Sequence, residues 1–340
     1  MSRRASAAAR QTSSPRSSRT SAAAAGVDAA GRPRGARAVT KKVADTVVPA
    51  ATVADAARQL LKHELKHMAK CLKRCSQRWH RKPEYLHQTR ISARRLQQHL
   101  ALFGELSGKT RQVRWLHKQL RSLLKASSKA RDLDVLLHHS AAGDIPAATR
   151  RKWQQRRRKL QQPLQKIERR LTRNEALKNC RRALLKAIRT SATRKRSVAV
   201  ASAPAASWAV EQAAIRLAEL QTAIPTVATS KSLHRFRLQV KQYRYQSELL
   251  LSLSDNAVIK RLVGCLLQVQ KQLGTLQDAV VAARSLKKTG TAKKKTTAGN
   301  HSDRQARIAA EATRLHTWLQ TKIAPQLTSL GRRLHTATRR

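Results

Sequence analysis

The chain has 340 residues, of which 72 are Lys or Arg and 18 are Asp or Glu, so its formal net charge is +54. The charge is spread along the whole sequence, which excludes a neutral domain with one basic tail, and it repels itself unless an anion screens it. No run of about 18 residues is apolar and free of charge, which excludes a membrane span. Four cysteines are too few for a disulfide scaffold. We expect a soluble intracellular protein with a strongly anionic partner.

Residues 1–50 are rich in Ser, Ala, Arg, Gly and Pro and contain no aromatic residue. Such a segment cannot bury enough apolar surface to offset the entropy of ordering, so we predict a disordered basic tail. The apolar stretch 22–25 is too short for a secretory signal. A transit peptide shares the Arg-rich, acid-poor composition and stays an alternative.

From residue 51 onward apolar residues recur at steps of three and four, which predicts helices throughout. No alternating strand pattern occurs. Residues 190–206 lose the helical period and contain Pro204, which predicts a linker, and residues 287–302 predict a lysine-rich loop. The region 51–340 is therefore expected to consist of a linker and two helical halves, 51–189 and 207–340.

One catalytic motif occurs in the first of these helices. His63-Glu64-Leu65-Lys66-His67 matches HExxH, in which two His hold Zn²⁺ and the Glu acts as a general base. Cys71 and Cys75 continue the series at steps of four. However, Lys66 adds a cation to the motif, and each step turns by about 40°, so one helix cannot wrap all four ligands around a metal. We expect no protease and no cofactor, and keep His63 and His67 as candidates for adventitious metal binding.

Two stretches of the sequence are repeated. Residues 86–97 (LHQTRISARRLQ) align with residues 233–244 (LHRFRLQVKQYR) at an offset of 147, and residues 125–135 align with residues 271–281 at an offset of 146. The offset of 146 aligns residues of like charge in the two halves: Lys125 with Lys271, Asp132 with Asp278 and, farther upstream, Arg114 with Lys260. Two regions that agree within one residue of register indicate an internal duplication.

The repeated helices each present two faces. In the first copy the predicted buried seam comprises Leu86, Thr89, Ala93, Leu96, Leu100 and Phe103; in the second it comprises Leu233, Phe236, Val240 and Tyr243. Beside each seam runs a basic stripe: His87, Arg90 and Arg94 in the first copy, and His234, Arg237, Lys241 and Arg244 in the second. Because two stripes in phase are hard to explain as solvated faces, we interpret them as a surface for closely spaced phosphates.

Acids are scarce in this sequence, so the aligned Asp132 and Asp278 need an explanation. One interpretation is that each begins or enters a helix and interacts with its exposed amides and dipole. The other is that each carboxylate pairs with an Arg of the stripe. Both interpretations are structural, and we expect neither acid to be catalytic.

At these residues the chain resembles the CHAD family, the conserved histidine α-helical domain, whose hallmark is a His followed by Arg or Lys at helical spacing in each of two halves. The resemblance covers about residues 55–338. It implies an all-α fold of two pseudo-symmetric four-helix bundles whose basic faces meet in a central groove. It also implies binding of inorganic polyphosphate and association with polyphosphate granules. No ExExK motif occurs, so we expect no accompanying CYTH triphosphatase domain.

We therefore predict a non-enzymatic polyphosphate-binding protein, cytoplasmic and associated with the granule or the nucleoid. The predicted binding residues are His87, Arg90, Arg94, Arg114, Lys125, His234, Arg237, Lys241, Arg244, Lys260 and Lys271.

The main alternative function is nonspecific nucleic-acid binding, to which the basic tail and the lysine-rich loop would contribute. Several aromatic residues fall in the apolar seams, which leaves few for base stacking, although duplex binding needs none. A phosphatase is disfavoured because metal-assisted phosphoryl transfer needs clustered carboxylates, and the 18 acids are scattered.

Overall fold

The computed structural model describes six stretches of the chain, and every structural statement concerns them: residues 51–79, 82–108, 110–139, 147–195, 197–288 and 297–338. All regular elements in these stretches are helices, and the one extended pairing is an isolated β-bridge between Thr52 and Pro204. The all-α prediction is therefore confirmed. The predicted disordered tail, residues 1–50, lies outside the described residues.

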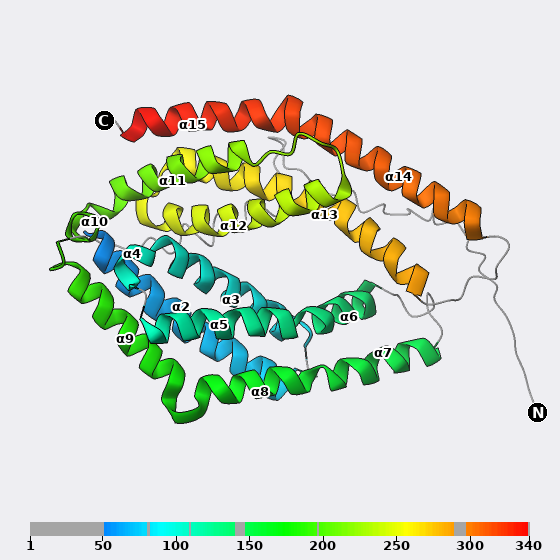
Figure 1. The fold of residues 1–340 in the computed structure, drawn as a ribbon, viewed down its shortest axis with the longest axis horizontal. Coiled ribbons are helices and arrows are strands. Elements are labelled where there is room, and N and C mark those ends of the chain that lie inside the picture. The colour runs from blue at the N-terminus through cyan, green and yellow to red at the C-terminus, as the bar shows by residue number, and fades with distance from the viewer. Residues whose placement is uncertain are drawn as a thin grey trace, which may run out of the picture.

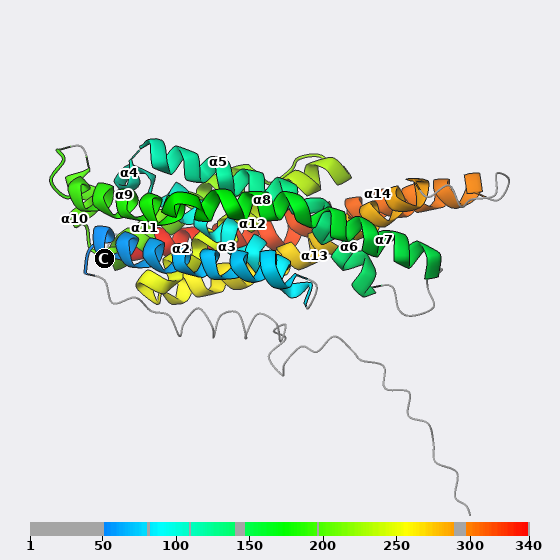
Figure 2. The ribbon, with the colours of Figure 1, turned by 90° about the horizontal axis from the view of Figure 1, so that it is seen from below.

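The first half contains nine helical segments: α2 (Val53–Arg78), α3 (Glu84–Leu102), α4 (Gly104–Ser107), α5 (Arg111–Ala126), α6 (Ser128–His139), α7 (Ala147–Lys159), α8 (Gln161–Thr172), the 3₁₀ turn η1 (Arg173–Glu175) and α9 (Ala176–Ser191). Thr52 and Thr110 cap α2 and α5, because their hydroxyls accept hydrogen bonds from backbone amides of the first turn. Helix α2 packs against α3, α8 and α9, and α5 packs against the same three helices. Seen from below, α8 and α9 run along the first half beside α2 (Figure 2).

The second half contains the remaining segments: α10 (Val198–Ser202), α11 (Ala205–Thr222), α12 (Ser230–Ser254), α13 (Ala257–Lys288), α14 (Thr297–Trp318), the π-helical turn η2 (Leu319–Ile323) and α15 (Ala324–Thr338). Thr229 and Ser232 form a reciprocal capping box at the start of α12. The π turn directly precedes Pro325, whose missing N–H cannot continue the regular hydrogen-bond ladder.

Both predicted breaks are shorter than the sequence suggested. Helix α9 continues to Ser191, and α10 forms inside the predicted linker 190–206. Helix α13 continues to Lys288 and α14 begins at Thr297, so both ends of the predicted loop 287–302 are helical, and its middle lies outside the described residues. Ala and Lys are good helix formers, and the helices on either side extend into these stretches despite the weak apolar period.

The internal repeat is visible in the arrangement of the helices. Four helical segments pack together in each half: α2, α3, α5–α6 and α7–α9 in the first, and α11, α12, α13 and α14–α15 in the second. Figure 1 shows the first half below and the second half above, with α3 next to α12. In the first half the third helix is interrupted at Ser127, whereas its counterpart α13 is continuous.

The predicted seams form the core. Thr89 and Ala93 have no exposed surface, and the other four residues of the first seam are at most 2% exposed. Phe103 at the end of α3 stacks on Trp208 of α11 with ring centroids 5.5 Å apart, which joins the cores of the two halves. Tyr243 departs from the prediction, because it is only half-buried and its hydroxyl donates a hydrogen bond to Glu219 over 3.0 Å.

None of the described helices is both long enough and apolar enough to cross a bilayer.

Candidate functional site

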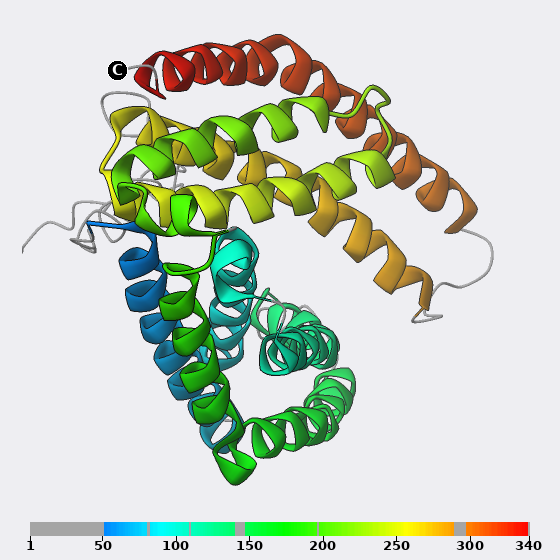
Figure 3. The ribbon, with the colours of Figure 1, turned by 60° about the vertical axis from the view of Figure 1, so that its left-hand side comes forward.

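The two basic stripes lie on α3 and α12, the pair of helices with the most extensive contact between the two halves (Figures 1 and 3). His87, Arg90 and Arg94 of α3 are half-buried, and so are Arg237 and Lys241 of α12. Half-burial lets the apolar stems of these side chains pack against the protein while their charged ends stay accessible. We refer to these five residues, together with Arg131 of α6, as the central cationic cluster.

Electrostatic interactions join the cluster across the two halves. The pKa of Lys241 is lowered to about 7, first by burial and then by repulsion from Arg237, Arg94, Arg244 and Arg90. Arg90 and Arg94 come from the first half, whereas Lys241 and Arg237 come from the second. Since a charge is felt this strongly only at short range inside a protein, the two stripes share one electrostatic field.

The same interaction recurs at other members of the cluster. Burial lowers the pKa of Arg237, and repulsion from Arg94 of the other half lowers it further. The pKa of His87 is lowered by burial and then by Arg131, Arg90 and Arg94, so the imidazole is neutral at neutral pH. An approaching anion would reverse these effects, because it favours the charged form of every one of these groups.

Arg90 is held by the break between α5 and α6. Its Nη1 donates a hydrogen bond to the carbonyl oxygen of Leu124 over 2.7 Å and another to the hydroxyl of Ser127. Burial and the neighbouring Arg94 lower the pKa of Arg90 to about 10, so the guanidinium stays charged at neutral pH. The interruption at Ser127 therefore fixes the position of one cation in the cluster.

Arg237 occupies the equivalent position in the second half but lacks this anchorage. Its guanidinium lies over Gly274 of α13, where an added Cβ would stand 3.8 Å from Nη2. Its Nε is buried and has no hydrogen-bond partner within the described residues, and the same holds for Nδ1 of His234, one turn earlier on α12. Buried polar atoms almost always have partners, and these two on one helix face have none among the described protein groups.

The two aligned acids sit beside these arginines. Neither is in the first turn of its helix, since Asp132 is the fifth residue of α6 and Asp278 lies deep inside α13. The interpretation as helix N-terminal acids is therefore wrong. Asp132 instead interacts favourably with Arg90, and Asp278 with Arg237, in matching positions of the two halves. These attractions point in the direction of the second interpretation, but no salt bridge within 4 Å joins either acid to its arginine in the described residues, so the pairing stays a prediction.

The remaining predicted binding residues either have protein partners or are exposed with no resolved effect on the pKa values of the cluster. Arg244 is buried: it donates to Gln270 over 2.9 Å, pairs with Glu248, and stacks on the ring of Tyr245. Its guanidinium therefore has protein partners and adds positive potential beside Lys241, and its direct contact with an anion stays a prediction. Four others are exposed on α5 and α13, and no pKa shift within the cluster is traced to them: Arg114, Lys125, Lys260 and Lys271.

Arg131 is the member of the cluster that sequence reasoning missed. It lowers the pKa of both His87 and Arg90, which places its charge among the residues of the first stripe. The repeat could not reveal it, because the aligned residue of the second half is the neutral Gln277. The one feature of the sequence that could have pointed to Arg131 is its position directly before Asp132.

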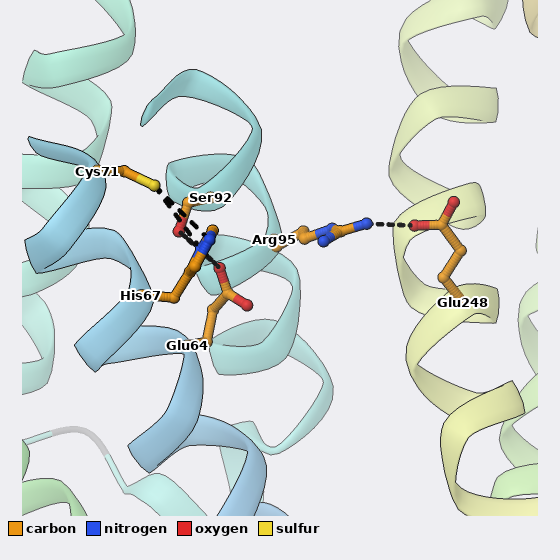
Figure 4. A network of polar contacts seen from close by, with 6 residues as sticks. All are labelled: Glu64, His67, Cys71, Ser92, Arg95 and Glu248. Atoms are coloured by element: carbon orange, nitrogen blue, oxygen red, sulfur yellow. Dashed lines mark hydrogen bonds and ion pairs between the residues drawn. The ribbon is translucent and has the colours of Figure 1, made fainter. Parts of the chain in front are cut away.

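Two of the HExxH residues, Glu64 and His67, join a network of polar contacts between α2 and α3 (Figure 4), whereas His63 is exposed and stacks on His67 with ring centroids 6.3 Å apart. Glu64 is 5% exposed, accepts a hydrogen bond from the hydroxyl of Ser92 over 2.6 Å, and lies 3.7 Å from Nδ1 of His67. Burial alone would raise the pKa of Glu64, but His67 and other neighbours lower it, so the carboxylate is charged. Within the described residues no group of three or more His, Cys, Asp or Glu side chains could hold a metal ion.

The two cysteines on the same helix are also unlike metal ligands. Burial raises the pKa of Cys71, and raises that of Cys75 to about 11, so both remain thiols at neutral pH. The sulfur of Cys71 lies 3.7 Å from Nε2 of His67. These residues fill the interface between α2 and α3 behind the cationic stripe.

Comparisons with known proteins agree with this architecture. The crystal structure of the CHAD domain from the plant Ricinus communis matches with a TM-score of 0.51 and 20% sequence identity, over 84% of this chain and 92% of that one. A search of curated proteins finds no match. The sequence model of the CHAD domain matches residues 59–287, which include both basic stripes. The chain therefore belongs to the CHAD domain family.

Proposed function

We propose that the protein binds inorganic polyphosphate through the central cationic cluster, does not hydrolyse it, and associates with polyphosphate granules. The observation that carries the proposal is the position of Arg94, whose charge acts on His87 in its own half and on Arg237 and Lys241 in the other. One anion lying along both stripes would neutralise all of these groups together.

A linear chain of phosphates suits this arrangement better than a single small anion. Arginine offers a planar fork of donors to phosphate oxygens, and lysine offers a compact charge. The unpartnered Nε of Arg237 and Nδ1 of His234 lie one helical turn apart, so successive phosphates of one chain could accept from both. The neutral His87 would gain a proton as the anion arrives and become a further donor.

The absence of catalysis is part of the proposal. The acids that face the cluster, Asp132 and Asp278, interact with Arg90 and Arg237. Metal-assisted phosphoryl transfer would instead need carboxylates gathered around Mg²⁺. The expected result of incubating the protein with polyphosphate and Mg²⁺ is therefore unchanged polymer length on a gel, and shortening of the polymer would contradict this part.

The binding site is tested by removing two charges from the cluster. We expect Arg94→Gln combined with Lys241→Gln to weaken binding of long-chain polyphosphate roughly 100-fold, because both cations stand where the two stripes meet. The matched control is Lys118→Gln combined with Lys322→Gln, which removes the same charge from exposed positions on α5 and η2. Equal losses in the two variants, measured by fluorescence anisotropy, would show that net charge alone determines binding.

Competition separates polyphosphate from nucleic acid. Duplex DNA should fail to displace labelled long-chain polyphosphate from the protein when an excess of DNA is added, whereas unlabelled polyphosphate with the same concentration of phosphate groups should displace it. Nonspecific duplex binding depends on backbone charge alone, so displacement would favour the nucleic-acid alternative. For the cellular part, a tagged protein should form foci in cells that make polyphosphate and lose them in cells that do not.

A further inference from the structure

A second concentration of cations lies on the other end of the first half, in a groove between α2 and α9. The groove has a volume of about 420 Å³, and its charged lining residues are Asp55, Arg58, Lys62, Arg182, Lys186 and Arg189. We call it the outer groove. Five cations and one carboxylate give it a net charge of +4.

The two helices present these cations as facing rows. Arg58 and Lys62 are four residues apart on α2, and Arg182, Lys186 and Arg189 follow one another at steps of four and three on α9. Residues at these spacings share a helix face, and seven residues of helix span about 10 Å. The rows therefore line an elongated trough suited to a linear anion.

The carboxylates near the groove do not neutralise these cations. Asp55 lies 3.6 Å from Arg58, and Glu175 lies 3.2 Å from Arg182, but each of these four side chains is 46% exposed or more, so both pairs are weak. No ion pair is recorded within the described residues for Lys62, Lys186 or Arg189. Three cations are left to repel one another in a concave site, and a bound anion would relieve that repulsion.

The corresponding surface of the second half is much less basic. The charge of the outer groove is therefore not simply a result of the high positive charge of the whole chain. There α11 and α15 take the places of α2 and α9. Helix α11 carries Glu211 and Glu219 against Arg216, and α15 adds two arginines, so the two helices together have a net charge of +1. The two helices also approach closely, with Gln221 donating a hydrogen bond to Thr328 over 3.2 Å. The groove is thus a feature of the first half that the duplication did not produce in the second.

The outer groove is separate from the central cationic cluster. It lies where α2 begins and α9 ends, and α10 contacts both of these helices. The cluster includes Arg131 of α6, and Figure 1 shows α6 and α10 at opposite ends of the first half. Figures 2 and 3 show α2 and α9 side by side along that half. A phosphate chain bound at the cluster would therefore leave the groove free.

We propose that the outer groove binds a second segment of linear condensed phosphate, so that one protein molecule holds two polymer strands. This inference rests on the proposed function of the central cluster for its choice of ligand. Each internal phosphate of such a polymer carries one negative charge, so a segment of about four phosphates matches the charge of the groove. Bridging by two sites of this kind would gather separate polymer chains.

The test is a calorimetric titration of the full chain with tripolyphosphate at low salt. We expect two equivalents to bind to the unmodified protein and one to bind to the variant Lys62→Gln, Lys186→Gln, Arg189→Gln, with groove affinity reduced roughly 100-fold. All three positions are exposed, so the variant should fold normally. The matched control is Lys322→Gln, Arg332→Gln, Arg333→Gln, three exposed positions of the second half, and it should keep two equivalents.

The outcomes distinguish failure of the groove from failure of the cluster. If the groove variant keeps two equivalents, or if the control loses one as well, the groove proposal is overturned while the proposed function stands. If Arg94→Gln with Lys241→Gln leaves both equivalents intact, the cluster fails as the binding site. Bridging has its own measurement: long-chain polyphosphate should make solutions of the unmodified protein scatter light, and the groove variant should scatter much less.

Discussion

At the scale of single residues, the cluster holds several groups in a state in which their positive charge is unfavourable, and a bound anion would relieve this. Lys241 is the clearest case, because its pKa of about 7 means that it is half neutral near physiological pH. Burial and four neighbouring guanidinium groups oppose its protonation, and a polyanion would favour it. Binding at pH 8 is therefore expected to take up a proton.

This leads to a pH dependence with a definite sign. Below pH 7 Lys241 is charged both with and without ligand, so affinity is unaffected by its titration. Above pH 7 the free protein loses the proton that the complex needs, and affinity for polyphosphate should fall about tenfold between pH 6.5 and pH 8. Burial and Arg131 lower the pKa of His87 in the free protein, so protonation of this imidazole on binding adds a pH dependence of the same sign.

The variant Lys241→Arg isolates the cause, because arginine stays charged throughout this range. Its affinity, measured by anisotropy at constant ionic strength, should fall much less than tenfold from pH 6.5 to pH 8. Lys271→Arg, at an exposed position on α13, is the matched control and should retain the tenfold fall. A Lys241→Arg protein with the same fall as the unmodified one would assign the pH dependence to another group.

The sequence repeat indicated the residues of the two basic stripes, and two features of their surroundings escaped it. The repeat identified Arg90 and Arg237 because both copies keep the cation. It could not show that Glu248 would take Arg244 out of the surface, since that depends on how the helices pack. It also overlooked Arg131, which has no charged counterpart in the second half.

At the scale of helices, α3 and α12 hold the two halves in register. Glu248 of α12 is 5% exposed and accepts from Arg244 of its own helix and from Arg95 of α3, whose Nη2 lies 3.4 Å away (Figure 4). Gln246 donates to Gln98 across the same interface over 3.0 Å. These contacts set how closely the two basic stripes approach.

Removing the carboxylate should therefore destabilise the protein strongly. Glu248→Ala leaves the buried Arg244 without its charge partner, which is expected to lower the free energy of unfolding by about 3–5 kcal/mol. Urea unfolding followed by circular dichroism measures this loss. Glu311→Ala is the control, because it breaks an ion pair with Arg314 that is largely exposed and should cost less than about 1 kcal/mol. Similar losses in the two variants would show that the interface does not depend on Glu248.

Helix lengths show what local sequence cannot determine. The seams on α3 and α12 followed from apolar spacing, and their burial was predicted nearly residue by residue. The ends of the linker and of the lysine-rich loop were predicted too far into the neighbouring helices, because a helix that already has several turns extends through weakly patterned residues. The interruption at Ser127, which positions Arg90, likewise depends on packing and left no mark in the periodicity.

At the scale of the whole molecule, the charge of +54 raises the question of whether organisation matters at all. A protein so basic attracts any polyanion, and the resulting affinity falls with salt as counterions return. An organised site adds directed hydrogen bonds to this attraction, and those survive screening better. The two contributions can therefore be separated by salt and by the position of the charges that are removed.

Residues 1–40 contain eight arginines and one acid, whereas Arg90 and Arg237 are only two charges. If charge alone determined binding, deletion of residues 1–40 would cost more affinity than Arg90→Gln with Arg237→Gln. We expect the opposite at about 150 mM salt, where the Debye length is about 8 Å: less than threefold loss for the deletion and roughly 100-fold for the double variant. Anisotropy titrations at several salt concentrations measure both. Because Arg90 is hydrogen-bonded to Leu124, thermal unfolding of the double variant must first show that it remains folded. A deletion that costs as much as the double variant would mean that the matched stripes of α3 and α12 confer nothing beyond their charge.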